Sequence, residues 1–164
     1  MVAKVLKILC VLFASATVML CGCHRDNAAK GLIETDFSAD FTADYNGLSV
    51  KGRMVNTRQG VSSIEFDSPE TLNGLSVRYK NGEVALVHGD VTATADEAYL
   101  PENSLPSALR SALQSAQGDD YTQKSDGIYQ INGITLTTDD NHLPKMMECA
   151  KWRVQFSNVK KLGD

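Results

Sequence analysis

The sequence predicts a mainly β (α+β) domain, a curved antiparallel half-barrel sheet of about nine or ten strands with one or two helices against its concave face. Two observations lead to this prediction. Short segments of alternating apolar and polar residues follow one another along most of the chain, as in half-buried antiparallel strands. Four Asn-Gly pairs, which suit type I′ hairpin turns, begin at positions 46, 73, 81 and 132.

The first hairpin has the clearest pattern. Residues 36–45 (DFSADFTADY) alternate without a fault, and residues 48–54 continue the alternation after the first Asn-Gly turn. An aromatic ring then covers a strand glycine on one face, while opposite charges pair on the wet face. The expected cross-strand pairs are Phe41 with Gly52 and Asp40 with Arg53.

The middle of the chain continues in the same way. Residues 61–67 predict a third strand, and residues 68–74 predict a proline-initiated turn or a single helical turn that stops near Gly74. Residues 75–80 and 83–88 form a second predicted hairpin, and residues 91–95 predict a further strand. The expected pairs of this hairpin are Tyr79 with Val84, Val77 with Leu86, and Lys80 with Glu83.

One helix is predicted after these strands. Ser104 is a suitable N-cap, Pro106 suits the first turn, and Gly118 is a natural stop. The apolar residues between them recur at helical spacing: Leu105, Ala108, Leu109, Ala112, Leu113 and Ala116.

The last predicted strands complete the sheet. Residues 127–138 predict a third hairpin with Tyr129 opposite Leu136, and residues 145–159 predict a closing strand. The alternation slips around Cys149 and Ala150, which predicts a β-bulge there. The closing strand places its large apolar side chains on one face: Trp152, Val154 and Phe156.

The predicted elements differ greatly in size. A sheet of about nine strands at ~4.8 Å spacing is roughly 40 Å across. A helix of about 14 residues is ~21 Å long and ~10 Å wide, too small to cover one face of that sheet. We therefore expect the sheet to curl into a half-barrel or barrel, which leaves either a filled core or a groove.

The N-terminus has the pattern of a bacterial lipoprotein signal. Lys4 and Lys7 precede an apolar run at residues 8–20 that is too short to span a bilayer. Residues 20–23 (LCGC) then resemble a lipobox, in which the last cysteine carries the lipid. The alternatives are a plain secretory signal with incidental cysteines, or a metal site that would lack a folded frame and a full ligand set. The resemblance implies that residues 1–22 are removed and that Cys23 takes a diacylglycerol anchor.

Cleavage there would give three parts: signal peptide 1–22, lipidated cysteine and tether 23–35, and a β domain at 36–164. The mature chain would keep 14 basic and 20 acidic residues, a formal charge of −6, which argues against nucleic acid as a partner. Cys149 would remain the one thiol free of lipid, and we expect it to be a small buried residue.

Residues 36–160 resemble the LolA/LolB type of lipoprotein-sorting and lipid-carrier proteins in their layout. The resemblance rests on FSADFTADYNG running into VKGRM, IEFDSPETLNGLSVRYKNGEVAL, the mid-chain LPENSLPSALRSAL and the late TLTTDDNHLPKMMECAKWRVQFSNV. It implies a curved antiparallel sheet that wraps around helices and an extracytoplasmic, membrane-anchored lipoprotein that binds or carries a lipid.

The sequence holds no recognisable catalytic or metal-binding motif. The histidines are scattered singly, and there is no nucleophile elbow, phosphate-binding glycine loop or Cys–His pairing. We therefore predict no enzyme activity, no cofactor and no metal. His88 is expected to be partly buried and hydrogen-bonded, and His142 to lie in a solvated acidic turn.

One apolar face remains as a candidate ligand site. Its residues come from the first three predicted strands: Phe37, Phe41, Tyr45, Leu48, Val50, Met54, Ile64 and Phe66. They form either a hydrophobic core or, in part, a groove for an acyl chain. The two corresponding functions are binding of a lipophilic ligand and, alternatively, an envelope lipoprotein that acts through protein–protein contacts with a filled core.

Overall fold

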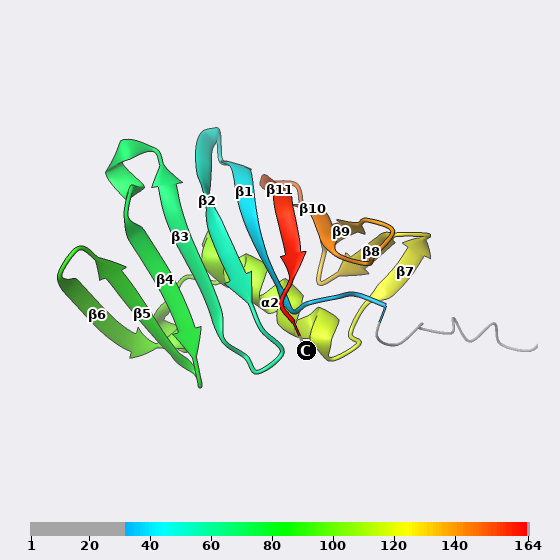
Figure 1. The fold of residues 1–164 in the computed structure, drawn as a ribbon, viewed down its shortest axis with the longest axis horizontal. Helices are drawn as coiled ribbons and strands as arrows, with labels where there is room; N and C mark the ends of the chain where they lie inside the picture. Colours follow the sequence, from blue (N-terminus) through cyan, green and yellow to red (C-terminus); the bar gives the residue numbers. More distant parts are fainter. Residues whose placement is uncertain (1–31, 164) are drawn as a thin grey trace, which may run out of the picture.

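The computed structural model describes residues 32–163, which form one antiparallel sheet of eleven strands and one α-helix (Figure 1). The helix is α2 (Leu105–Gln117), and single 3-10 turns lie at Glu70–Leu72 and Glu97–Tyr99. The strands are β1 (Phe37–Tyr45), β2 (Leu48–Asn56), β3 (Ser62–Ser68), β4 (Leu75–Lys80), β5 (Glu83–His88), β6 (Val91–Asp96), β7 (Thr122–Ser125), β8 (Ile128–Ile131), β9 (Ile134–Thr138), β10 (Pro144–Glu148) and β11 (Trp152–Lys161).

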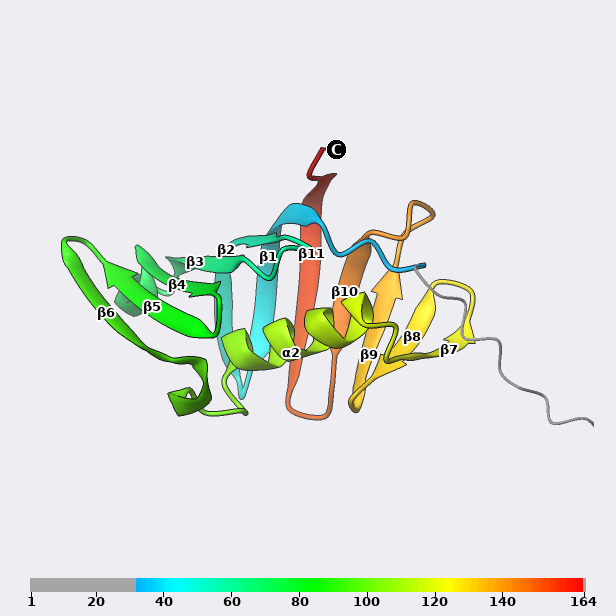
Figure 2. The ribbon, with the colours of Figure 1, turned by 90° about the horizontal axis from the view of Figure 1, so that it is seen from below.

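The sheet is open, with β6 at one edge and β7 at the other. Its order is β6-β5-β4-β3-β2-β1-β11-β10-β9-β8-β7, so every neighbouring pair is consecutive in sequence except β1 with β11. Helix α2 carries the chain from one edge of the sheet to the other and lies across its concave face (Figure 2). The sheet is therefore a half-barrel around a single helix, and the mainly β prediction is confirmed.

The predicted hairpin registers are confirmed. Phe41 lies opposite Gly52 and Asp40 opposite Arg53 in the first hairpin. The six pairs of β4 with β5 and the four pairs of β8 with β9 run without a shift. They include each pair expected from the sequence: Tyr79 with Val84, Val77 with Leu86, Lys80 with Glu83, and Tyr129 with Leu136.

The C-terminal side differs from the sequence-based prediction in two places. Cys149 and Ala150 do not form a bulge within one closing strand but belong to the turn that joins β10 to β11. The amide of Cys149 donates to the carbonyl oxygen of Trp152 at 2.9 Å, which closes that turn. The short strand β7, with the sequence TQKS, was not predicted. The sheet therefore has eleven strands, where nine or ten were expected.

The helix forms as its sequence predicts. The Ser104 hydroxyl accepts the amide of Ser107, Pro106 lies in the first turn, and Gly118 is the C-cap. The apolar stripe is buried against the sheet: Leu105, Leu109, Ala112, Leu113 and Ala116. On the sheet side, the rings of Phe37 and Phe156 meet edge to face at 5.9 Å between centroids.

The packed part of the chain begins before β1. Ile33, Glu34 and Thr35, which fall in the predicted tether, are buried. The Glu34 carboxylate receives hydrogen bonds from Arg58 and an ion pair from Lys161 at 2.9 Å. The predicted signal peptide, Cys23 and the rest of the tether lie outside the described residues. Within residues 32–163, the structure has no helix with the length and apolar character needed to span a bilayer.

Candidate functional site

The eight residues proposed from the sequence as a ligand lining all belong to the concave side of β1, β2 and β3. Six of them are buried in the hydrophobic core, which also contains the apolar stripe of α2. Tyr45 is half-buried and its hydroxyl donates to the carbonyl oxygen of Asn103 at 2.7 Å. Leu48, beside the β1–β2 turn, is 47% exposed. The six buried residues are Phe37, Phe41, Val50, Met54, Ile64 and Phe66.

The concave face continues past the helix onto β4, β5 and β6. Figure 2 shows these strands extending beyond the N-terminal end of α2. Exposure rises from the core towards the edge: Tyr79 and Val84 are buried, Leu86 is 37% exposed and Val91 is 70% exposed. Cross-strand pairing places Leu86 opposite Ala93 and Val84 opposite Ala95, so one apolar surface runs across β5 and β6. We call the four exposed residues, Leu86, Val91, Ala93 and Ala95, the open apolar face; it adjoins the buried Val84.

His88 lies at one end of this face, opposite Val91. The sequence predicted a partly buried histidine, but His88 is exposed. Its Nε2 atom lies 3.1 Å from the carbonyl oxygen of Asn73, so the expected hydrogen bond is present.

A polar cluster marks the boundary between the core and the open apolar face. Arg110 of α2 is buried, with its guanidinium carbon 5.0 Å from the centre of the Tyr79 ring. Its Nε atom donates to Glu97 Oε1 at 2.7 Å, which ties the helix to the segment that follows β6. Burial raises the pKa of the Tyr79 hydroxyl, and the Glu97 carboxylate adds to the rise, while the Ser107 hydroxyl and the Arg110 guanidinium oppose it.

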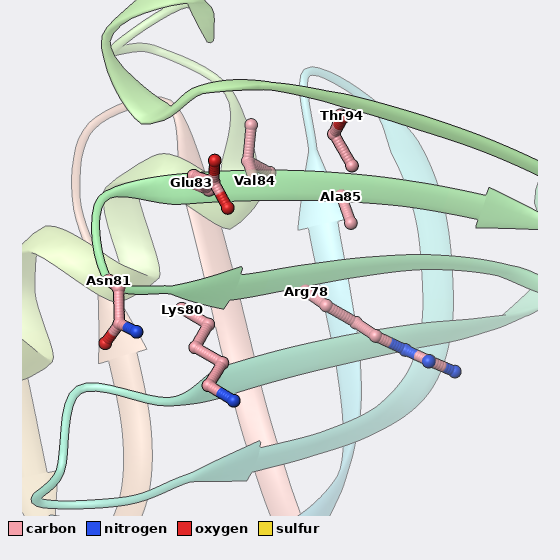
Figure 3. Close-up of a pocket in the computed structure, with 7 residues that line it drawn as sticks. All are labelled: Arg78, Lys80, Asn81, Glu83, Val84, Ala85 and Thr94. Carbon is pink, nitrogen blue, oxygen red and sulfur yellow. The ribbon is translucent and has the colours of Figure 1, made fainter.

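A hollow of about 400 Å³ lies on the opposite, convex side of β4–β6 (Figure 3). None of the eight residues predicted to line a ligand site contributes to it. Its lining is mixed, since Arg78, Lys80 and Glu83 bring charges of both signs next to Val84 and Ala85. Its lining consists of Arg78, Lys80, Asn81, Glu83, Val84, Ala85 and Thr94.

The described residues hold no group of three His, Cys, Asp or Glu side chains that is placed to bind a metal ion. His142 lies in the turn between β9 and β10, where the Asp139 carboxylate accepts the amides of Asn141 and Leu143. Cys149 is half-buried in the β10–β11 turn and packs against the hydrophobic core, so it is less buried than expected. His142 and Cys149 therefore both lie in turns between strands, apart from the open apolar face.

Comparison with known proteins gives similarity at the level of the fold. An uncharacterized conserved protein from Thermus thermophilus is 10% identical, with a TM-score of 0.52 over 84% of this chain and 85% of that one. A LolA superfamily protein from Nitrosomonas europaea is 12% identical, with a TM-score of 0.41 over 85% of this chain and 90% of that one. No protein-family model and no curated protein matches the sequence. The first similarity shows a shared fold across most of both chains.

Proposed function

We propose that this chain is a lipoprotein anchored through Cys23 to the extracytoplasmic side of a membrane, and that its β domain binds an acyl chain or another lipophilic ligand. The supporting observation is the open apolar face. Soluble proteins seldom leave a continuous apolar surface next to the core without a use for it. Here Leu86 and Val91 extend the buried surface of Val84 into solvent.

The position of the helix gives this face its shape. Helix α2 covers the central strands, and its Arg110 side chain reaches Tyr79 on β4. The curved strands β5 and β6 continue beyond that contact with no second helix above them in the described chain. A ligand on this face would lie between the curved sheet and the start of the helix. On binding, the apolar surfaces of the ligand and of the exposed side chains would both be removed from water, which favours the complex.

The alternative is an envelope lipoprotein that acts through protein–protein contacts. The observation in its favour is the dense packing of the first three strands, since six of the eight residues predicted to line a groove are buried in the core. In neither function does the chain need a catalytic group, a metal or a cofactor. We therefore propose that the chain binds a ligand or a partner and does not catalyse a reaction.

Native mass spectrometry tests the ligand directly. The protein would carry Cys23→Ser, so that the covalent anchor does not contribute to the mass. We expect a species heavier than the polypeptide by the mass of one lipophilic molecule, released when the protein unfolds. A protein that shows only the polypeptide mass, both as purified and after mixing with a long-chain fatty acid, would contradict ligand binding and favour the protein-contact alternative.

A further inference from the structure

The two edges of the sheet are built differently. Strand β7 has four residues, carries Lys124, and its pairing with β8 shifts between Gln123 and Ser125. Short length, an edge lysine and an irregular register are the devices that stop an edge from pairing with another strand. Strand β6 lacks all three, since its six residues pair with β5 without a shift and include no lysine or proline. All six are exposed.

The alternation of hydrogen-bonded and non-bonded pairs between β5 and β6 shows which backbone groups of β6 face outward. The amide of Glu97 donates to the carbonyl oxygen of Gly82, directly opposite it in the continued register. In an antiparallel pair, bonded and non-bonded pairs alternate. The backbone groups of Val91, Ala93 and Ala95 therefore point towards β5. Those of Thr92, Thr94 and Asp96 point away from the sheet, and the two threonines inside the strand offer two donors and two acceptors to an added strand.

The side chains around these backbone groups determine which residue types an added strand needs. Val91, Ala93 and Ala95 face the concave side, so an incoming strand would place apolar residues next to them. Asp90 and Asp96 stand at the two ends. A second copy of β6, paired through Thr92 and Thr94, would bring Asp90 of one copy opposite Asp96 of the other. Like charges in that position disfavour pairing.

We propose that β6 is a docking edge for an extended segment of a partner protein, apolar at alternate positions and with a lysine or arginine at each end. The segment adds a twelfth strand to the sheet by β-augmentation. Its main-chain amides bond to Thr92 and Thr94, and its terminal cations face Asp90 and Asp96. This inference rests on the edge of the sheet and does not require a lipid ligand.

The test uses the peptide KVTVTVK with a fluorescent label, titrated into the purified full-length chain and followed by fluorescence anisotropy. Thr94→Pro removes one outward N–H, which proline tolerates at an edge facing solvent. Thr94→Ala keeps the N–H and is the matched control. We expect Thr94→Pro to weaken binding at least about tenfold and Thr94→Ala to change it less than about twofold. Thermal melting checks that both variants remain folded.

Two further peptides keep the test decisive even if Thr94→Pro fails to fold. A peptide N-methylated at both threonines cannot donate to the carbonyl oxygens of Thr92 and Thr94, and the peptide EVTVTVE reverses the terminal charges. Both should bind the wild type at least about tenfold more weakly than KVTVTVK. The proposal is overturned if either binds equally well, or if no peptide binds. It is also overturned if sedimentation shows a dimer that Thr94→Pro dissociates, because a second copy would then occupy the edge.

Discussion

The guanidinium carbon of Arg110 lies 5.0 Å from the centre of the Tyr79 ring, while its Nε atom is bonded to Glu97. The two side chains differ in burial, since that of Arg110 is 5% exposed and that of Glu97 is 30% exposed. Removing the carboxylate leaves a buried cation without its partner, whereas removing the cation leaves a carboxylate that water can reach. The two partners should therefore differ in how much their loss costs the fold.

We predict that Glu97→Ala lowers the free energy of unfolding by about 2–3 kcal/mol and Arg110→Met by about 1 kcal/mol, because methionine keeps the packing on the Tyr79 ring. The double variant should be more stable than Glu97→Ala alone. Urea unfolding of the three variants and the wild type measures this. An additive loss in the double variant would show that the two side chains are not coupled.

Gly52 is required by the close approach of two neighbouring strands. A Cβ atom at this position would overlap the carbonyl oxygen of Glu65 on β3 and lie 3.0 Å from the Phe41 ring. We predict that Gly52→Ala destabilises the domain by about 1–3 kcal/mol through overpacking. Gly163→Ala is the control, because no atom lies within 4 Å of its Cβ position. Equal thermal melting temperatures for the two variants would contradict this explanation.

Glu34 links stability to pH. Burial alone would raise the pKa of its carboxyl, but hydrogen bonds from Lys161 and the Asp36 amide, with the Arg58 and Lys161 charges, lower it overall. A lowered folded-state pKa adds stability that is fully present above the ordinary glutamate pKa of 4.5. This contribution declines as the pH falls below that value and vanishes below the folded-state pKa.

The measurement compares the wild type with Glu34→Gln by urea unfolding from about pH 7 down to about pH 3. We expect the wild type to be more stable at neutral pH and the difference to shrink as the pH falls. A difference that stays constant over this range would mean that the Glu34 charge does not contribute.

The anchor can be tested separately from the fold. Cys23→Ser should give an unprocessed or soluble protein, because a serine oxygen cannot form the thioether. Cys21→Ser is the matched control and should be cleaved and membrane-bound, as in the wild type. Cell fractionation with mass analysis measures both. Membrane-bound, cleaved protein from Cys23→Ser would refute the lipobox interpretation.

Local sequence patterns predict most of the hairpins in this fold. The Asn-Gly turns and strict alternation fix the register of β1 with β2 and of β4 with β5 because both signals lie within a few residues of the paired positions. The turn between β10 and β11 contains Cys149, Ala150 and Lys151, none of which is a typical turn residue, so the local pattern does not distinguish this turn from a bulge. Strand β7 is short and polar on both faces and has no alternation to detect.

The candidate site was also predictable only in part. The sequence indicates which residues lie on the concave face, but not which of them are covered. Alternation assigns residues to the concave face, and all eight predicted lining residues lie there. Which part of that face is covered depends on where α2 crosses the sheet, a long-range property that no local pattern contains. Phe41 and Val50 are therefore buried in the core that the helix completes, while Leu86 and Val91 remain exposed.

The most direct test of the open apolar face is titration of a fluorescent long-chain fatty acid into the wild type, Ala93→Asp and Thr92→Asp. The two substitutions are adjacent on β6, both positions are exposed, and only Ala93 faces the concave side. We predict that the wild type binds, that Ala93→Asp weakens binding at least about tenfold because the ligand would have to bury a charge, and that Thr92→Asp binds like the wild type. No binding by the wild type, or equal weakening by both substitutions, would contradict the proposed ligand site.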